Sequence, residues 1–197
     1  MKYDIIISGV GGQGILSIAT TIGLAAIENG LYLKQAEVHG MSQRGGAVQS
    51  HLRISSGEVI SDLIPLGEAD MILSVEPMES LRYMPWLSEK GWLVTNSRPF
   101  VNIDNYPPLD EVLNEIRKWN YHVAIDADEI AHSIHSARSS NMVILGAASN
   151  FISIPEDSFL RAIEKMFMKK GRDVIDLNIK AFSEGKNAGL SNSSTGI

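Results

Sequence analysis

The sequence contains no cysteine, and this absence excludes several kinds of chemistry from the chain itself. Without a thiol, the chain supplies no thiolate nucleophile, no cysteine-ligated zinc site and no ligands for an iron–sulfur cluster. Basic residues are also scarce, because 17 Lys and Arg stand against 23 Asp and Glu and give a net charge of −6. We therefore expect no binding of nucleic acid or of anionic membrane surfaces.

Long hydrophobic runs are missing as well. The first apolar run ends at Ser8 and follows Asp4, where a secretory signal would be positively charged. The longer stretch 15–27 is interrupted by Ser, Thr and Gly, and it falls short of the ~18 apolar residues that span a membrane. These features predict a cytoplasmic protein. Its 197 residues, 44% of them apolar and 20% charged, are typical of one soluble globular domain.

The apolar segments predict an α/β fold, a three-layer α/β/α Rossmann-like domain with a mostly parallel, mixed sheet. The run 3–8 is typical of a strand buried on both faces, and residues 13–29 and 31–37 then complete a βαβ unit. Further strands are expected over 47–54, 59–64, 70–75, 92–95 and 121–126, the last strand of the sheet. Helices are expected over 76–85, 110–119, 127–136, 140–151, 156–169 and 173–185. We place the domain at 1–186 and expect 187–197, rich in Ser, Asn and Gly, to be a poorly ordered tail.

A glycine-rich turn, Gly9-Val-Gly-Gly-Gln-Gly14, lies between the first predicted strand and the first predicted helix. It satisfies G-x-G-x-x-G, in which the glycines allow a tight turn and let a phosphate approach the N–H groups of the helix N-terminus. A second interpretation is that the glycines only let the helix pack close to the sheet. Ile15 and Leu16 stand where a Walker A loop has Lys and Ser or Thr, so an NTPase is not expected.

A nicotinamide site remains open on this evidence. Glu37 lies 23 residues after Gly14, near the distance expected for the acid that binds the ribose of NAD. However, none of the five tyrosines is followed by a lysine four residues later, so the catalytic pair of a short-chain dehydrogenase is absent.

The first predicted helix is almost without charge, because Glu28 is the only charged residue between Ile5 and Leu33. A helix with one face in water normally carries Lys and Glu on that face. We therefore expect this helix to be covered on both sides. The second cover is either another subunit or the carboxy-terminal helices of the same chain.

A basic segment follows the second predicted strand. Within residues 34–53 the Lys and Arg outnumber the acids by two, whereas residues 54–81 hold six acids and no base. Arg44 precedes Gly45 and Gly46, which leaves its guanidinium beside bare backbone, an arrangement that suits a phosphate or a carboxylate. The alternative is an ordinary turn with a solvated arginine. The basic and histidine residues of the segment are Lys34, His39, Arg44, His51 and Arg53.

Two pairs of titratable residues near the end of the last predicted strand carry weaker signals. His132 and His135 are three residues apart on a predicted helix and could share a metal, but no third ligand is visible. Asp126 and Asp128 are more typical of a helix cap.

The glycine turn and the basic segment together resemble a known family. Gly9-Val-Gly-Gly-Gln-Gly-Ile15 and Glu37-Val-His-Gly-Met-Ser-Gln-Arg-Gly-Gly46 are similar to the beta subunits of indolepyruvate ferredoxin oxidoreductases. These subunits consist of the gamma-type domain of the 2-oxoacid:ferredoxin oxidoreductase family. The likeness continues through residues 68–70, 141–146 and 178–182. Relatives acting on pyruvate or 2-oxoglutarate usually carry a Tyr-Gly-Pro run before Arg-Gly-Gly, so the form found here favours arylpyruvates.

The resemblance implies a subunit of a heteromeric oxidoreductase of anaerobic aromatic amino acid catabolism. That enzyme oxidatively decarboxylates arylpyruvates such as indolepyruvate to aryl-acetyl-CoA, with CoA as cosubstrate and ferredoxin as acceptor. Thiamine diphosphate and the iron–sulfur clusters belong to the larger alpha subunit, in agreement with the absence of cysteine here. This chain would then hold no cofactor or metal and be inactive alone.

The resemblance places the candidate binding residues on the two loops, facing a phosphate, CoA or the partner subunit. They are Gly9, Gly11, Gly12, Gly14, Arg44, Gly45 and Gly46, and no catalytic residue is assigned. Two alternative functions stay open within the oxidoreductases: the gamma subunit of a pyruvate, ketoisovalerate or 2-oxoglutarate enzyme, and a free-standing NAD(P)-binding Rossmann protein. A binding module without catalysis is a third.

Overall fold

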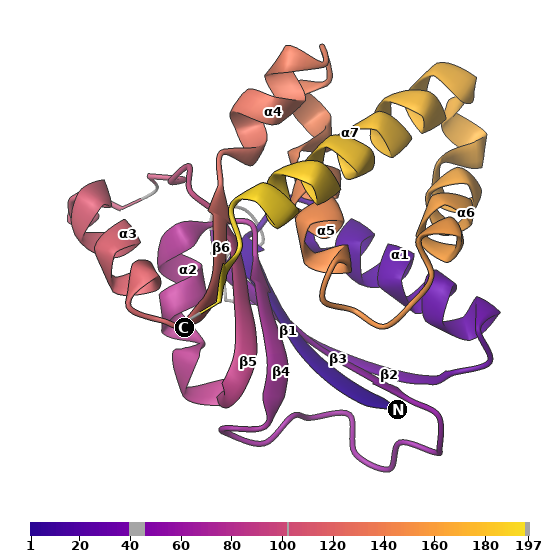
Figure 1. The fold of residues 1–197 in the computed structure, drawn as a ribbon, viewed down its shortest axis with the longest axis horizontal. Coiled ribbons are helices and arrows are strands. Elements are labelled where there is room, and N and C mark those ends of the chain that lie inside the picture. Colours follow the sequence, from indigo (N-terminus) through magenta and orange to yellow (C-terminus); the bar gives the residue numbers. More distant parts are fainter. Residues whose placement is uncertain (40–45, 102, 196–197) are drawn as a thin grey trace.

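The computed structural model describes residues 1–39, 46–101 and 103–195, which form a mixed sheet between two layers of helices (Figure 1). Its seven strands run in the order β2-β3-β1-β4-β5-β6-β7. The central pairs β1/β4, β4/β5 and β5/β6 are parallel, and the pairs β1/β3, β2/β3 and β6/β7 are antiparallel. The three-layer α/β/α Rossmann-like fold with a mixed sheet is confirmed.

The elements follow most of the predicted ranges. The strands are β1 (Lys2–Val10), β2 (Tyr32–His39), β3 (Ala47–Ser55), β4 (Ala69–Ser74), β5 (Leu87–Asn96), β6 (Tyr121–Ile125) and β7 (Ser194–Thr195). The α-helices are α1 (Ile15–Glu28), α2 (Pro77–Arg82), α3 (Leu109–Arg117), α4 (Ala127–Ser133), α5 (Ser140–Ser149), α6 (Glu156–Phe167) and α7 (Arg172–Ser191). Short 3₁₀ turns are η1 (Met84–Trp86), η2 (Ala137–Ser139) and η3 (Met168–Lys170).

Alternation along β1 divides the core between the two faces of the sheet. Ile5 and Ile7 are fully buried in the cluster that includes α1, α5, α6 and α7. Ile6 points the other way and joins a second cluster with Val112 and Ile116 of α3. Both faces of the parallel strands are therefore covered, as expected for a continuous β-branched run.

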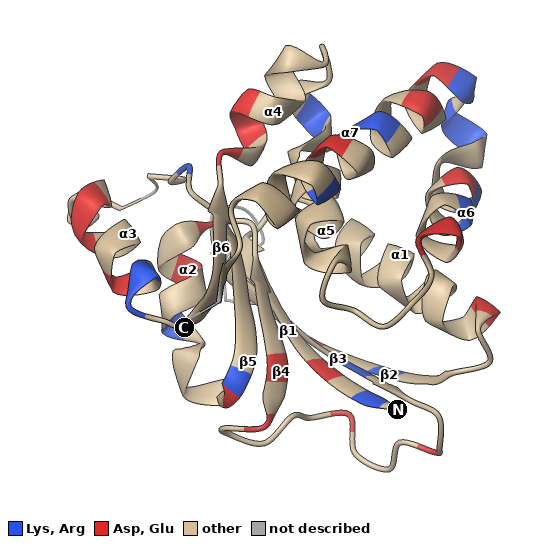
Figure 2. Ribbon diagram, viewed as in Figure 1, with Lys and Arg blue, Asp and Glu red and all other residues tan. Residues whose placement is uncertain are grey.

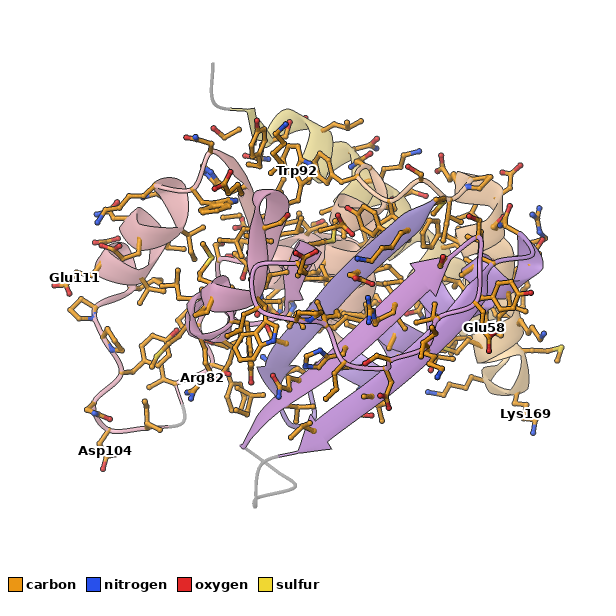
Figure 3. All side chains as sticks on the ribbon, turned by 90° about the horizontal axis from the view of Figure 1, so that it is seen from below. Glu58, Arg82, Trp92, Asp104, Glu111 and Lys169 are labelled. Atoms are coloured by element: carbon orange, nitrogen blue, oxygen red, sulfur yellow. The ribbon has the colours of Figure 1, made fainter. Side chains whose placement is uncertain are left out.

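The first βαβ unit is split by a strand that the sequence did not place there. β3 lies between β1 and β2 and pairs antiparallel with both. The predicted strand 59–64 is wrong, because this segment forms no ladder and lies on the helix-free face of β2 and β3, which Figure 3 shows with Glu58 labelled. Side chains of the two strands hold it there instead, by bonds described below.

Helices α5 and α7 touch backbone to backbone through glycines. A Cβ atom on Gly146 would lie 1.9 Å from the carbonyl oxygen of Phe182, and one on Gly185 would lie 1.9 Å from that of Val143. Such an approach excludes any side chain at these two positions. The glycines thereby fix the place of α7 over α5.

The predicted boundary at residue 186 does not coincide with an end of regular structure. Helix α7 continues to Ser191, and Ser194 then pairs with His122 at the edge of the sheet. The described part of the predicted tail is therefore helix and short strand, and β6 is not the last strand. Among the described residues, no helix is long and apolar enough to cross a membrane.

Candidate functional site

The glycine turn links β1 to α1 at the carboxyl edge of the parallel strands. Gly14 caps α1 in the left-handed region with φ 83°, and Gly12 has φ 101°, so both positions favour glycine. The Gln13 side chain closes the turn, because its Oε1 accepts a 2.7 Å hydrogen bond from the Val10 N–H. The turn is thus held in one shape by its own residues.

The individual glycines serve different purposes. A Cβ on Gly9 would lie 2.3 Å from the Val75 side chain, and one on Gly14 would lie 2.4 Å from Asn141 Nδ2. A side chain at Gly9 would therefore displace Val75, and one at Gly14 would displace Asn141 and would also be strained by the positive φ. A Cβ on Gly12 would meet no atom within 4 Å, so this position leaves open space beside the helix N-terminus.

The two predicted loops meet in space. The Gly11 N–H donates a 2.9 Å hydrogen bond to the carbonyl oxygen of Gly46. The glycine turn and Gly46 of the basic segment are therefore neighbours, although 35 residues separate the bonded pair in the sequence. The predicted residues Arg44 and Gly45 lie outside the residues that the structure describes.

The other basic residues of the segment have structural partners. The Arg53 guanidinium donates to both carboxylate oxygens of Asp4 at 2.9 Å. It also donates to the carbonyl oxygens of Ser61 and Leu63, at 3.1 and 2.9 Å. Arg53, which was counted among the basic residues of the segment 34–53, is therefore committed to holding the segment 56–66.

Lys34 and His51 hold the same segment. The Lys34 amine donates to the Ile60 carbonyl oxygen at 2.7 Å, and His51 Nδ1 accepts the Ile64 N–H at 3.0 Å. Burial, with a smaller contribution from the Arg53 charge, lowers the pKa of His51. A neutral His51 is the form that can accept this bond.

A cavity of about 620 Å³ opens on the other side of the glycine turn. Its walls are the turn itself, the stretch from the end of α4 to the start of α5, and the end of α6 with the first half of α7. Arg138 and Lys170 bring two positive charges to the wall, and none of the described residues that line it is acidic. The lining residues are Gly12, Gln13, Gly14, Ser17, His135, Ser136, Ala137, Arg138, Ser139, Asn141, Phe167, Lys170, Val174, Leu177 and Asn178.

Asn141 connects the cavity to the turn. Its Nδ2 donates to the Gly14 carbonyl oxygen at 3.3 Å, while its Oδ1 accepts the N–H of Met142 at 3.0 Å. Arg138, Lys170 and the cavity were not predicted as parts of a site. No sequence signal marks them, because their proximity depends on how α7 packs.

A smaller hollow of about 320 Å³ lies between Gly12, Leu16 and Glu37. Glu37 therefore does lie near the glycine turn, as the nicotinamide hypothesis requires. The topology differs from that of a nicotinamide-binding domain, however. β3 separates β2 from β1, so Glu37 is not at the end of a parallel strand adjacent to β1.

Helix α1 is covered within the chain by α6. Thr21 is fully buried, and its hydroxyl donates to the Ser17 carbonyl oxygen at 2.8 Å. Asn29 Nδ2 donates to Ser158 Oγ at 2.9 Å, and Glu28 pairs with Arg161. This face of α1 is therefore covered by a carboxy-terminal helix of the same chain, which was one of the two expected covers. The face away from α6 leaves Leu16 and Ile27 exposed, at 51% and 59%.

The paired titratable residues act at helix ends. Asp126 Oδ1 caps α4 by accepting the Glu129 N–H at 2.8 Å, as predicted. His135 lies beyond the end of α4, with φ 60°, so it does not share a helical face with His132. Within the described ranges no three His, Asp or Glu residues are grouped to hold a metal ion.

Comparison with known proteins places these features in a family. The family described as pyruvate ferredoxin/flavodoxin oxidoreductase matches residues 4–188. Indolepyruvate oxidoreductase subunit IorB of Archaeoglobus fulgidus is 37% identical, over 97% of both chains. The protein of the same name from Methanothermobacter thermautotrophicus is 38% identical, over 94% of this chain and 96% of its own.

Solved structures agree with the fold. A gamma subunit of a keto/oxoacid ferredoxin oxidoreductase from Geobacter sulfurreducens is 25% identical with a TM-score of 0.69, over 96% of this chain and 99% of its own. A 2-oxoglutarate:ferredoxin oxidoreductase of Magnetococcus marinus, solved with 2-oxoglutarate, coenzyme A and succinyl-CoA, has a TM-score of 0.78 at 24% identity. The likeness to the latter covers 96% of this chain and 31% of that one. On the near full-length match of sequence, the chain belongs to the pyruvate ferredoxin/flavodoxin oxidoreductase family.

Proposed function

We propose that this chain is the small subunit of an indolepyruvate:ferredoxin oxidoreductase, which oxidatively decarboxylates arylpyruvates to aryl-acetyl-CoA and reduces ferredoxin. The observation that carries the proposal is the full-length similarity to subunits named for indolepyruvate, at 35–38% identity in four archaeal relatives. Subunits named for 2-oxoglutarate are less similar, at 25–27%.

The cofactors of the reaction belong, on this proposal, to a larger alpha subunit. A chain without cysteine does not fit an iron–sulfur cluster, since thiolates are the usual ligands. The part left to this chain is to complete the shared site and to bind CoA or the partner through its two adjoining loops.

Reconstitution tests this division of labour. The isolated chain should show no dye or ferredoxin reduction with indolepyruvate and CoA, and activity should appear when the larger subunit is added. Activity of the chain alone would contradict the proposal. A panel of indolepyruvate, pyruvate, ketoisovalerate and 2-oxoglutarate separates it from the gamma-subunit alternative. Tight binding of NAD(P) by the isolated chain would instead select the nicotinamide hypothesis.

Arg44 is the residue proposed to contact an anion at the shared site. Replacing it with Ala should lower activity of the complex by roughly 30- to 150-fold, the effect of losing a charge-assisted contact worth about 2–3 kcal/mol. Arg44→Lys should be nearly as damaging, because lysine lacks the bidentate fork. A rise in the apparent constant for CoA alone, or for indolepyruvate alone, identifies the anion. Less than a twofold change in every constant would assign Arg44 to a solvated turn.

The exposed face of α1 is proposed to contact the larger subunit. It carries Leu16, Thr20 and Ile27 and no charge. Thr20→Lys should leave the stability of this chain within ±0.5 kcal/mol, as for other surface changes, and weaken assembly. Thr21→Lys is the matched contrast, because Thr21 is buried and its replacement should unfold the chain. Unchanged affinity of the Thr20→Lys chain for the larger subunit would place the contact elsewhere.

A further inference from the structure

The cavity beside the glycine turn has a charge that contrasts with the rest of the molecule. The chain as a whole carries −6, yet the cavity wall, in the part of the chain that the structure describes, holds two cations and no acid. Figure 2 shows acidic and basic segments interspersed along α6 and α7, where Arg172 pairs with Asp176 and Lys186 with Glu156. The cavity-lining cations differ from these paired ones.

Neither cation of the wall is neutralised by a carboxylate. Arg138 makes no hydrogen bond or ion pair with any residue in the described ranges, and the Lys170 amine lies 5.3 Å from the centre of the Phe167 ring. Arg138 belongs to η2 and Lys170 to η3. The two residues are 32 positions apart in the sequence, and the fold brings them to one cavity. An unpaired guanidinium and an unpaired ammonium at one cavity form a site for an anion.

The backbone before Arg138 is bent in a way that side chains usually avoid. His135 takes φ 60°, and the chain there is held by two hydrogen bonds, from His135 N to the His132 carbonyl oxygen at 2.9 Å and from Ser136 N to that of Ala131 at 2.8 Å. This is a Schellman ending in which glycine is the usual residue. The turn carries the chain directly from α4 into the cavity wall at Ser136–Ser139.

The remaining walls match an organic ligand rather than a bare ion. Phe167, Val174 and Leu177 give one apolar side, while Ser17, Asn141 and Asn178 provide groups for hydrogen bonds. A volume of about 620 Å³ falls within the range of small-molecule sites, roughly 300–1,000 Å³.

From this combination we infer that the cavity binds a phosphate-bearing organic anion of nucleotide size, with Arg138 and Lys170 as its cationic contacts. The phosphate lies against these two residues and the open side of the turn at Gly12, and the organic part lies against the apolar wall. The inference rests on the proposed function only for the choice of CoA as one probe. Two sources share this chemistry, CoA and a free nucleotide, and the experiment separates them.

The test is calorimetric titration of the full chain with ADP, CoA and dephospho-CoA, and with adenosine and pantetheine as ligands without phosphate. ADP or CoA should bind saturably, adenosine and pantetheine should not, and binding should weaken with added salt. Stronger binding of CoA than of dephospho-CoA and ADP assigns the site to CoA, and the reverse order assigns it to a free nucleotide.

Variants decide whether the named cations form the site. Arg138→Ala and Lys170→Ala should each weaken binding by roughly tenfold or more, and the double variant by roughly 100-fold. Lys169→Ala is the matched control, since the Lys169 side chain extends outward (Figure 3) and does not line the cavity, and it should stay within twofold. Circular dichroism confirms that each variant is folded.

Two results would overturn the inference: no saturable binding of either phosphate ligand, or equal binding by the double variant and the original chain. Both are read on the chain without its larger partner. They are therefore independent of the reconstituted activity that tests the proposed function.

Discussion

Arg53 and Arg138 lie in two regions of the molecule that use basic side chains in opposite ways. The Arg53 side chain is 13% exposed and faces Asp4, which is 1% exposed. Its guanidinium makes two hydrogen bonds to the Asp4 carboxylate and two to carbonyl oxygens of the segment 56–66. Arg138 is exposed at a cavity and has no such acceptor within the described ranges.

The difference teaches that basic residues clustered in the sequence need not form a ligand site. Lys34, His51 and Arg53 belong to two paired strands, β2 and β3, and all three side chains bind the segment 56–66. Arg138 and Lys170 are far apart in sequence and meet only in the folded chain. The basic side chains of the first region are bonded within the fold, whereas those of the second region remain available to a ligand.

The largest expected effect is the loss of Arg53. Arg53→Leu should lower the free energy of unfolding by about 3–5 kcal/mol, because it leaves the buried Asp4 carboxylate with only the exposed Lys2 amine, 3.1 Å away. Arg138→Leu is the matched control and should change stability by less than about 0.5 kcal/mol. Urea denaturation measures both. Similar values for the two variants would remove the distinction between the regions.

The second prediction concerns how the cavity side is built. Gly185→Ala should destabilise the chain by about 1–3 kcal/mol, because the methyl group would enter the backbone of α5 at Val143. Gly57→Ala, where a Cβ meets nothing within 4 Å, is the control and should be nearly neutral. Thermal denaturation compares the two. A neutral Gly185→Ala would show that α7 is not held by this contact.

The third prediction is a pH dependence confined to the Arg53 region. Since burial lowers the pKa of His51 from 6.5, the folded chain binds fewer protons there than the unfolded chain. The stability contributed by His51 is therefore present above pH 6.5 and is lost as the pH falls through the lower folded pKa. His51→Gln should flatten the decline in unfolding free energy between pH 7 and pH 5. An unaltered pH profile would contradict the assignment.

The smallest effect is expected at His135. Replacing it with Gly should raise stability by about 1 kcal/mol, since glycine takes the left-handed conformation without strain. His132→Gly, inside α4, should lower stability by about the same amount. Comparing the unfolding free energies of the two variants sharpens the contrast, because among the described residues His135, at the cavity, is the one non-glycine residue with a positive φ. A loss of stability in the His135 variant would indicate that the imidazole itself packs there.

Local signals predicted much of the fold. Pro155 before two acids located the start of α6 at Glu156, and the capping carboxylate of Asp126 located α4. The segment 59–64 misled because its apolar residues resemble a strand. Its backbone is instead satisfied by the side chains of Arg53 and Lys34, and side-chain-to-backbone bonds leave no periodicity in the sequence.

The candidate site was predicted only on its glycine side. The turn at Gly9–Gly14 has a motif because local geometry demands particular residues at fixed spacing. The opposite wall depends on Gly146 and Gly185, which set the distance between two helices, and such a contact between distant residues has no local pattern. The end of α7 was missed for a related reason, since Ser, Asn and Gly in its last turns are retained by packing rather than by helix propensity.

The order of the cavity walls along the chain has a consequence for biosynthesis. The turn at residues 12–14 is among the first parts to be translated, whereas the wall at 167–178 follows after six of the seven strands. In a nascent chain the glycine turn is therefore synthesised before α7 can pack over α5. Any ligand that needs both walls is captured only after α7 has emerged from the ribosome, so occupancy of the cavity is a marker of a completed fold.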